Sequence, residues 1–288
     1  MGTLTNVHGL PQAILDAVTA DPYTGGTGDI SCTKLIDSPQ IRVLGGKHTN
    51  EIVVDVSDRV FSLMGQALHT VLERAGLKEE GVVIEERLYA EVNGWQVSGQ
   101  VDRIHIADGT LSDFKMTTVW KQHGSDSWTR QLNVLRWLAH KNGHQQITRL
   151  EVVAVFRDWR KAEAKRNPSY PQAAIMTIPV PVWPLDEAEE YIRERVYIHQ
   201  AASRGEEVPC TDEERWFSGN TYALMKTGGK RALKVSADRS SLPELTEGQY
   251  IDVRVGEYKR CQHYCDVSQF CEQWAKTKRT GGVNDDDA

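Results

Sequence analysis

The sequence predicts an α/β protein in which a mixed sheet is flanked by helices. Two segments, about 57–75 and 126–143, repeat apolar residues at helical spacing. Between them, residues 82–117 change to the pattern of strands, and this stretch contains two tight-turn dipeptides, Asn93-Gly94 and Asp108-Gly109. Because strands and helices are mixed along the chain, an α/β sandwich accounts for the pattern.

The individual elements can be followed along the chain. Residues 1–29 are rich in Gly, Thr and Pro, so we expect a flexible N-terminal arm. The first helix, from Ser57 to Ala75, begins at a plausible N-cap and stops at Gly76. The later elements are expected as strands at 83–89, 95–106 and 111–117, a helix at 126–143, strands at 151–156 and 175–180, and a helix from about Pro184 to Ser203.

We expect one domain over residues 30–275. Its last part, about 205–275, is less regular and contains four of the five cysteines. Residues 276–288 end in Gly-Gly-Val-Asn-Asp-Asp-Asp-Ala, which indicates a disordered tail.

Composition limits the class of protein. With 288 residues, 40% hydrophobic and 26% charged, the chain is typical of a globular protein. It has no apolar run of about 18 residues and no basic stretch followed by an apolar one at the N-terminus, so we expect no membrane span, no signal peptide and a cytoplasmic location. The net charge of −6 is not that of a typical nucleic-acid-binding protein. An enzyme that holds cations on carboxylates can nevertheless be acidic overall.

Two aspartates and a lysine lie on neighbouring strands of the predicted sheet. Asp102 lies in the second strand, and Asp113 and Lys115 lie in the third. Side chains two residues apart on a strand share a face, so Asp113 and Lys115 point to the same side and Phe114 points away. Mg²⁺ and Mn²⁺ bind carboxylate oxygens and keep several waters, while a lysine can orient the attacking water and offset phosphate charge. The cluster indicates a site for phosphodiester hydrolysis; solvated charges on a polar sheet face are the alternative.

The pattern G-x-x-D followed by D-x-K resembles the PD-(D/E)XK nuclease superfamily, with Gly99 opening the first motif. Residues 65–73 resemble the histidine-bearing first helix of its RecB-like branch, and Gln131 opens a helix similar to the Q-x-x-x-Y helix of that branch. The resemblance implies a restriction-endonuclease-like core. It also implies these site residues: His69, Asp102, Asp113 and Phe114 at the metal, Lys115 at the water, and Gln131 in support.

The chain departs from the superfamily pattern at two positions. Val101 replaces the proline that gives the superfamily its name, and Leu135 stands where the tyrosine of the helix motif is expected. Neither change removes a metal ligand. Glu86, on the first strand, is an additional acid that can serve the site.

Three cysteines, Cys261, Cys265 and Cys271, lie within eleven residues, close enough to converge on one metal centre. Their flanking residues are polar, which argues against three separate buried thiols. A fourth ligand is available from Cys210, in a polar loop, or from Cys32, which fits an apolar register and can equally be a core residue. We prefer Cys210. Four thiolates suit a [4Fe–4S] cluster or tetrahedral Zn²⁺, and His263 can also ligate zinc.

A cysteine triplet behind a RecB-like core resembles the iron–sulfur nucleases, including the AddB helicase–nuclease subunit and RecB-like CRISPR-associated exonucleases. Those proteins have C-x2-C-x5-C, whereas this chain has C-x3-C-x5-C. Their remaining cysteine lies near the start of the domain in a Cys-Pro pair, and here that pair reads Ser38-Pro39. The resemblance favours [4Fe–4S] over zinc.

Two basic segments are candidates for contact with DNA. Residues 157–170 mix arginines and lysines with Trp159 and Tyr170, as single-strand binders do. Residues 226–234 form a second basic run. Both patterns also fit solvated loops.

Together these features predict a DNA nuclease that depends on Mg²⁺ or Mn²⁺. The resemblance implies an exonuclease acting on single-stranded ends. The alternative is a non-catalytic scaffold that keeps the nuclease fold and the metal cluster within a DNA recombination or CRISPR adaptation complex.

Overall fold

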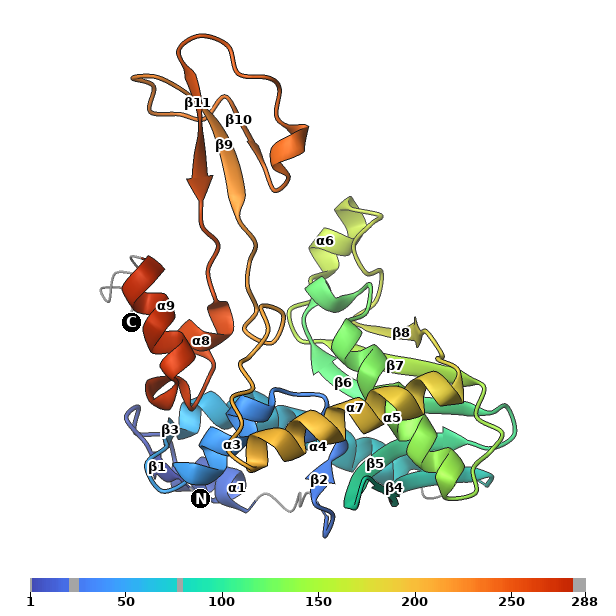
Figure 1. Ribbon diagram of the computed structural model, residues 1–288. Helices are drawn as coiled ribbons and strands as arrows, with labels where there is room; N and C mark the ends of the chain where they lie inside the picture. The colour runs from blue at the N-terminus through green and yellow to red at the C-terminus, as the bar shows by residue number, and fades with distance from the viewer. Residues whose placement is uncertain (1, 21–25, 77–79, 282–288) are drawn as a thin grey trace. The chain divides into compact units, whose positions relative to one another are not determined.

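The computed structural model describes residues 2–20, 26–76 and 80–281 (Figure 1). They form two compact units. The sheet unit comprises Gly2–Asp37 and Val53–Glu206, and the cysteine unit comprises Ser38–Ile52 and the chain from Glu207 onward. We expected a single domain over 30–275. The structure instead divides the chain, and the second boundary lies close to the expected start of the cysteine segment at about residue 205.

A mixed six-stranded sheet organises the sheet unit. Its order is β2-β5-β6-β7-β8, and β4 pairs with β5. β6 and β7 run parallel, whereas β4 with β5, β5 with β6, and β7 with β8 are antiparallel. The mixed sheet is therefore the one expected from the sequence. The strands are β2 (Ile30–Ser31), β4 (Val82–Val92), β5 (Trp95–His105), β6 (Thr110–Thr117), β7 (Arg149–Phe156) and β8 (Ile175–Val180).

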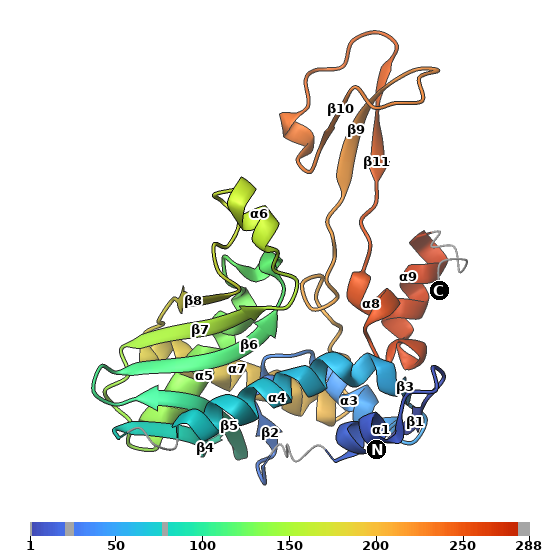
Figure 2. The same cartoon turned by 180° about the vertical axis from the view of Figure 1, so that it is seen from behind.

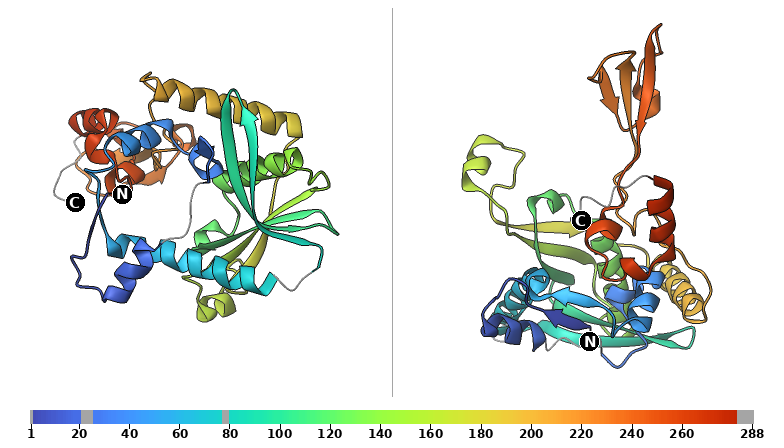
Figure 3. Two further views of the ribbon diagram at one scale, coloured as in Figure 1. Left: turned by 90° about the horizontal axis from the view of Figure 1, so that it is seen from below. Right: turned by 90° about the vertical axis from the view of Figure 1, so that its left-hand side faces the viewer.

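Helices cover both faces of this sheet. α5 (Asp126–Lys141) and α7 (Leu185–Ser203) pack against each other and lie in front of the sheet in Figure 1. α4 (Val60–Gly76) contacts β4 and β6 and lies in front when the molecule is seen from behind (Figure 2). The view from below in Figure 3 shows the same layers. Leu132, Leu135 and Leu138 recur at helical spacing on α5 and are almost fully buried, so the apolar stripe read from the sequence forms the core.

The N-terminal residues are more ordered than expected. β1 (Thr3–Thr5) pairs in parallel with β3 (Val53–Asp55), and α1 (Gln12–Thr19) follows it. The expectation of a flexible arm is therefore wrong for these residues, because the partner strand lies about fifty positions downstream and leaves no local signal. The remaining elements of the unit are α2 (Cys32–Leu35), η1 (Val56–Arg59), η2 (Val119–Lys121) and α6 (Lys161–Arg166).

The start of the first long helix also differs from the expectation. Residues 56–59 form a separate 3-10 turn before α4, and the capping side chain is that of Asp55, not Ser57. Asp55 accepts hydrogen bonds from Ser57 N, Val7 N and Thr5 Oγ1. These bonds hold the pKa of Asp55 well below its usual range, the bond from Val7 being the largest cause.

The cysteine unit contains a sheet where we expected irregular chain. Strands β10, β9 and β11 form a three-stranded antiparallel sheet with β9 in the centre. α9 continues to Gly281, so the tail is not disordered from residue 276, and residues 282–288 lie outside the described residues. None of the described helices is long and apolar enough to cross a membrane. The elements are α3 (Pro39–Lys47), β9 (Thr221–Lys226), β10 (Lys234–Ser236), η3 (Arg239–Ser241), β11 (Gln249–Arg254), α8 (Lys259–His263), η4 (Ser268–Phe270) and α9 (Glu272–Gly281).

Candidate functional site

The candidate site begins where β5 and β6 separate. Their ladder ends at the pair Arg103 and Ser112, so the next opposed residues are Asp102 and Asp113. Just beyond this pair, the backbone N–H of Phe114 donates to Asp102 Oδ2 at 2.7 Å. The hairpin thus brings both aspartates to one point, as the sequence predicts.

Asp113 is the most buried charged group of the site, with only 2% of its surface exposed. Lys115 Nζ lies 3.0 Å from Asp113 Oδ1 and 2.8 Å from Oδ2, and Gln131 Nε2 donates to Oδ1 at 3.1 Å. Oδ2 is buried and accepts no hydrogen bond of good geometry, although the ammonium is within ion-pair distance. Asp113 therefore retains an oxygen that can serve another positive partner.

The electrostatics of the cluster keep Lys115 charged. Burial lowers the pKa of Lys115, but the charges of Asp113 and Asp102 and the hydrogen bond to Asp113 outweigh burial, so the pKa lies above its ordinary value. Burial, and then repulsion from Asp113, raises the pKa of Asp102 to about 7. Without a cation, the two aspartates are difficult to ionise together.

His69 reaches the same point from α4. Its Nδ1 lies 3.5 Å from Asp102 Oδ2 and 3.8 Å from Glu85 Oε1, and its ring meets the Phe114 ring edge-on at 6.4 Å. The nearby Glu85 carboxylate raises the pKa of His69 above its ordinary value, burial opposes the shift, and Asp102 adds to it. The histidine singled out in the sequence is thus part of the cluster.

A cavity of about 670 Å³ contains all of these groups. Gly99 contributes to its wall, and a Cβ atom there would lie 2.5 Å from Leu135 Cδ2. The glycine therefore lets α5 approach β5 closely and places Gln131 beside Asp113. Six predicted residues of the nuclease site line this cavity, namely His69, Asp102, Asp113, Phe114, Lys115 and Gln131.

The additional acid of the site is Glu85, not Glu86. In the antiparallel register Glu86 is opposite Val101, and its carboxylate contacts His144 Nε2 at 2.9 Å outside the cavity. Glu85 instead lines the cavity. The expectation for Glu86 is wrong because a one-residue difference in position moves a side chain to the other face of a strand. The sequence could indicate that an acidic residue of this strand lines the cavity. Which of Glu85 and Glu86 does so depended on the strand register.

Cys32 and Cys210 lie in different surroundings. Cys32 lines the cavity of the aspartate cluster, is 3% exposed, and its thiol points to Gln131 O at 3.6 Å. Burial raises the pKa of Cys32 to about 12, so this thiol stays protonated. Cys210 lines a small cavity in the cysteine unit together with Cys261, Cys265 and Cys271. The structure thus groups Cys210 with the triplet.

Ser38, which stands where the resemblance implies a cysteine, contacts Cys210, which lines this second cavity. Its Oγ is 3.0 Å from Cys210 Sγ and also accepts a hydrogen bond from Ile41 N at the start of α3. Gln40 Nε2 donates to Cys271 Sγ at 3.2 Å. Burial raises the pKa of Cys210 to about 11 and also raises that of Cys265. None of the five cysteines, all within the described chain, forms a disulfide. His263 does not line this cavity.

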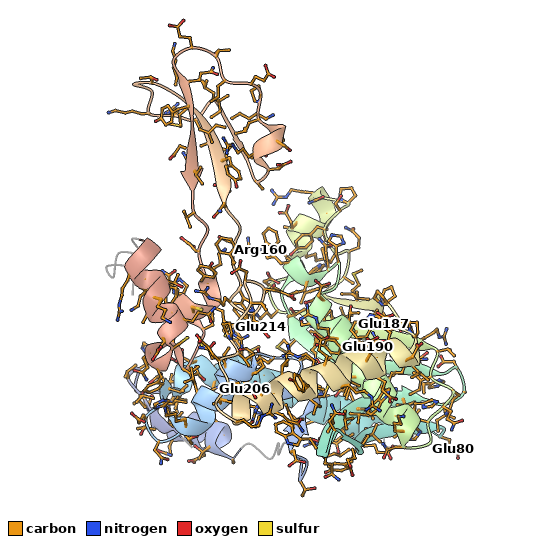
Figure 4. The ribbon with its side chains drawn as sticks, viewed as in Figure 1. Glu80, Arg160, Glu187, Glu190, Glu206 and Glu214 are labelled. Atoms are coloured by element: carbon orange, nitrogen blue, oxygen red, sulfur yellow. The ribbon has the colours of Figure 1, made fainter. Side chains whose placement is uncertain are left out.

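The two basic segments belong to different units. Arg160, exposed ahead of α6, and Lys161 and Lys165 lie in the sheet unit (Figure 4). Trp159 Nε1 donates to Pro171 O at 2.7 Å, and Tyr170 Oη accepts from Arg160 N at 2.9 Å, so both aromatic side chains also hold this loop together. Residues 226–234 form the β9–β10 connection of the cysteine unit.

Comparison with known proteins adds little. No protein-family model matches the chain, and no curated protein matches it. Among solved structures, the chain is similar to one entitled "Crystal structure of SSO0001", with a TM-score of 0.48 and 14% identity over 70% of this chain and 89% of that chain. At this level of similarity, what can be said of the site's chemistry rests on its own residues.

Proposed function

We propose that this protein is a divalent-metal-dependent DNA nuclease whose site is formed by His69, Asp102, Asp113, Lys115 and Gln131. One observation carries the proposal: these five side chains, from two strands and two helices, converge in a single cavity. Carboxylates that oppose each other beside a lysine suit phosphodiester hydrolysis, in which a phosphate, a water and a cation have to be held together.

The residues present fit a divalent metal ion. His69, Glu85 and Asp102 each offer a ligand atom, and the three atoms lie within 4.8 Å of one another. Asp113 adds a buried oxygen that accepts no hydrogen bond. Mg²⁺ or Mn²⁺ in this position would polarise a phosphate oxygen and lower the pKa of a bound water.

The chain's own groups have separable roles. Lys115 is held protonated by its two carboxylate neighbours, so it donates a hydrogen bond to the attacking water or to the phosphate and does not act as the base. Gln131 fixes the Asp113 carboxylate through its bond to Oδ1. His69 Nδ1 lies 3.5 Å from Asp102 Oδ2 in the same cavity, so the two can share a cation. Negative charge that develops on phosphate thus meets a fixed ammonium.

The nuclease proposal is tested with Lys115→Ala and with Lys121→Ala as the control. Lys121 is an exposed lysine that contacts Ser125 and does not line the cavity. With labelled DNA and Mn²⁺, we expect Lys115→Ala to cleave roughly 10²- to 10³-fold more slowly, and Lys121→Ala to match the wild type. DNA with each end blocked in turn, compared with circular single strands, tests the exonuclease assignment. Equal cleavage by both variants would refute the assignment to this site. Inactive wild type that still binds DNA would favour the scaffold alternative.

We further propose that the cysteine unit holds a [4Fe–4S] cluster on Cys210, Cys261, Cys265 and Cys271. Four thiolates on one tetrahedral Zn²⁺ lie roughly 3.8 Å apart, given Zn–S bonds of about 2.3 Å. Among the described residues, only His69, Glu85 and Asp102 bring three ligand atoms within 4.8 Å, so the thiols are spaced more widely than one zinc ion needs. An iron-to-protein ratio near four in anaerobically purified protein supports the cluster, whereas stoichiometric zinc contradicts it.

A further inference from the structure

Glu85 has a backbone conformation that strands do not normally contain. Its φ is +51°, although it lies inside the eleven-residue strand β4. The pairing of β4 with β5 runs from Val82 to Val92 and omits only Glu85, which lies across from Asp102 in the same register. A left-handed φ at a residue other than glycine is strained, and such strain persists where the surroundings hold the residue in place.

Two neighbouring side chains hold the Glu85 carboxylate in position. Gln100 Nε2 donates to Glu85 Oε2 at 2.6 Å, and Arg87 Nη2 donates to Gln100 Oε1. Arg87 and Gln100 are themselves a directly opposed pair on β4 and β5 and also line the cavity. The amide is therefore oriented by the arginine, and it binds one oxygen of the carboxylate.

The other oxygen of Glu85 faces the nuclease cluster. Oε1 lies 3.8 Å from His69 Nδ1, and ligand atoms of Glu85, His69 and Asp102 fall within 4.8 Å of one another. Asp113 lines the same cavity and is only 2% exposed; its Oδ2 accepts no hydrogen bond of good geometry and lies 2.8 Å from the Lys115 ammonium, so this buried oxygen can also face a divalent cation. His69, Glu85, Asp102 and Asp113 thus line one cavity, whose positive side chains include Lys115, beside Asp113, and Arg87, which donates to Gln100.

We propose that Glu85 is a direct ligand of the divalent metal, together with His69 and Asp102, and that Gln100 is a positioning residue that orients the Glu85 carboxylate. This inference rests on the proposed nuclease function. An imidazole nitrogen and several carboxylates replace much of the water shell that Mg²⁺ prefers to keep, so the site favours Mn²⁺ over Mg²⁺.

The chain offers a matched pair of variants one residue apart. Glu85→Gln keeps the size of the side chain and removes its charge, while Glu86→Gln makes the same change on the opposite face of the same strand. Glu86 contacts His144 and does not line the cavity. Binding of Mn²⁺ to DNA-free protein is measured from the loss of the electron paramagnetic resonance signal of the free aqueous ion. We expect Glu85→Gln to weaken Mn²⁺ binding at least 10-fold, Gln100→Ala to weaken it less, and Glu86→Gln to leave it unchanged.

A third variant separates ligation from folding. Glu85→Gly introduces a residue that adopts φ +51° without strain, so the melting temperature of this variant should equal or exceed that of the wild type. Its Mn²⁺ binding should nevertheless fall as in Glu85→Gln. Wild-type Mn²⁺ affinity in both Glu85→Gln and Glu85→Gly would overturn the inference and leave the nuclease proposal standing. Absence of Mn²⁺ binding by the wild type itself would instead contradict the proposed function.

Discussion

The two units hold their chemically active groups in opposite ways. In the sheet unit, charged groups come from regular strands and helices and satisfy one another: Lys115 pairs with Asp113, and His69 lies against Asp102. In the cysteine unit, Cys261 lies in the short helix α8 and the other three cysteines lie in loops, and the thiol contacts include Ser38 and Gln40. In the sheet unit the fold itself pairs the charged groups, whereas in the cysteine unit it groups free thiols around a small cavity, where the metal centre we propose would bring them together.

The largest effect is expected from removing a thiol of the cysteine unit. Cys210→Ser should lose the cluster and destabilise that unit by several kcal/mol, because a structural metal site supplies folding free energy. Cys32→Ser is the control, since Cys32 lines the other cavity. Iron content and hydrogen exchange over residues 207–276 are measured for both variants. If Cys32→Ser lost as much iron as Cys210→Ser, the assignment of the fourth ligand would be wrong.

A smaller effect is expected from loosening the site of the sheet unit. Gln131→Ala removes the bond to Asp113 Oδ1 without removing a proposed metal ligand, so cleavage should slow roughly 10- to 100-fold with little change in melting temperature. Arg136→Ala, on the same helix but directed at the carbonyls of Ile147 and Trp183, provides the contrast. It should affect melting temperature more than the cleavage rate. The reverse pattern would contradict a positioning role for Gln131.

The way in which the charged groups of the sheet unit affect one another's ionisation can be tested by varying the pH. In metal-free protein the folded-state pKa of Asp102 is about 7, above the unfolded value of about 4. The folded state therefore binds more protons in this window, and the contribution of Asp102 to stability, present at low pH, is lost as pH rises through 7. We therefore expect Asp102→Asn to raise the free energy of unfolding of metal-free protein, relative to wild type, more at pH 8 than at pH 5, by on the order of 1–2 kcal/mol. Denaturant titrations of both proteins at both pH values, repeated with Mn²⁺, measure this. If the difference in free energy of unfolding between Asp102→Asn and the wild type were the same at both pH values, Asp102 would ionise normally.

The last prediction concerns two glycines that line the cavity of the aspartate cluster. A Cβ at Gly65, in the middle of α4, would contact nothing within 4 Å, so Gly65→Ala should stabilise the protein by about 0.5–1 kcal/mol. A Cβ at Gly99 would meet Leu135 and Leu138, so Gly99→Ala should destabilise it by about 1–3 kcal/mol. Thermal unfolding of the two variants should therefore show shifts of opposite sign. Shifts of the same sign would mean that α5 does not pack closely on β5.

Much of the candidate site follows from local regularity in the sequence. The period of two along a strand relates Asp113 to Lys115, and the tight turn at Asp108-Gly109 places Asp102 opposite them. The helical period predicted α4 and α5 and indicated that Gln131, on an apolar stripe, needs a polar partner, which is Asp113. Such relations are set by backbone geometry over a few residues, so they can be read without knowing the rest of the fold.

Other features depended on partners that are distant in the chain. The register of β4 on β5 selected Glu85 over Glu86, and pairing between residues 3–5 and 53–55 ordered a segment expected to be flexible. The three-stranded sheet of residues 221–254 likewise formed where no strong local pattern was visible. Long-range pairing has no signature within a short window, because it is stabilised by contacts made only after the chain has folded.

The sequence by itself determined the mixed α/β class, the aspartate and lysine hairpin, the histidine helix and the cysteine triplet. Only the tertiary structure decided that these belong to two compact units, that Cys210 lies with the triplet while Cys32 lines the cavity of the aspartate cluster, and that Glu85, with a left-handed φ, lies beside His69 and Asp102. The physical reason is the same in each case: spacing along the chain fixes which side chains share a face, whereas packing fixes which faces meet.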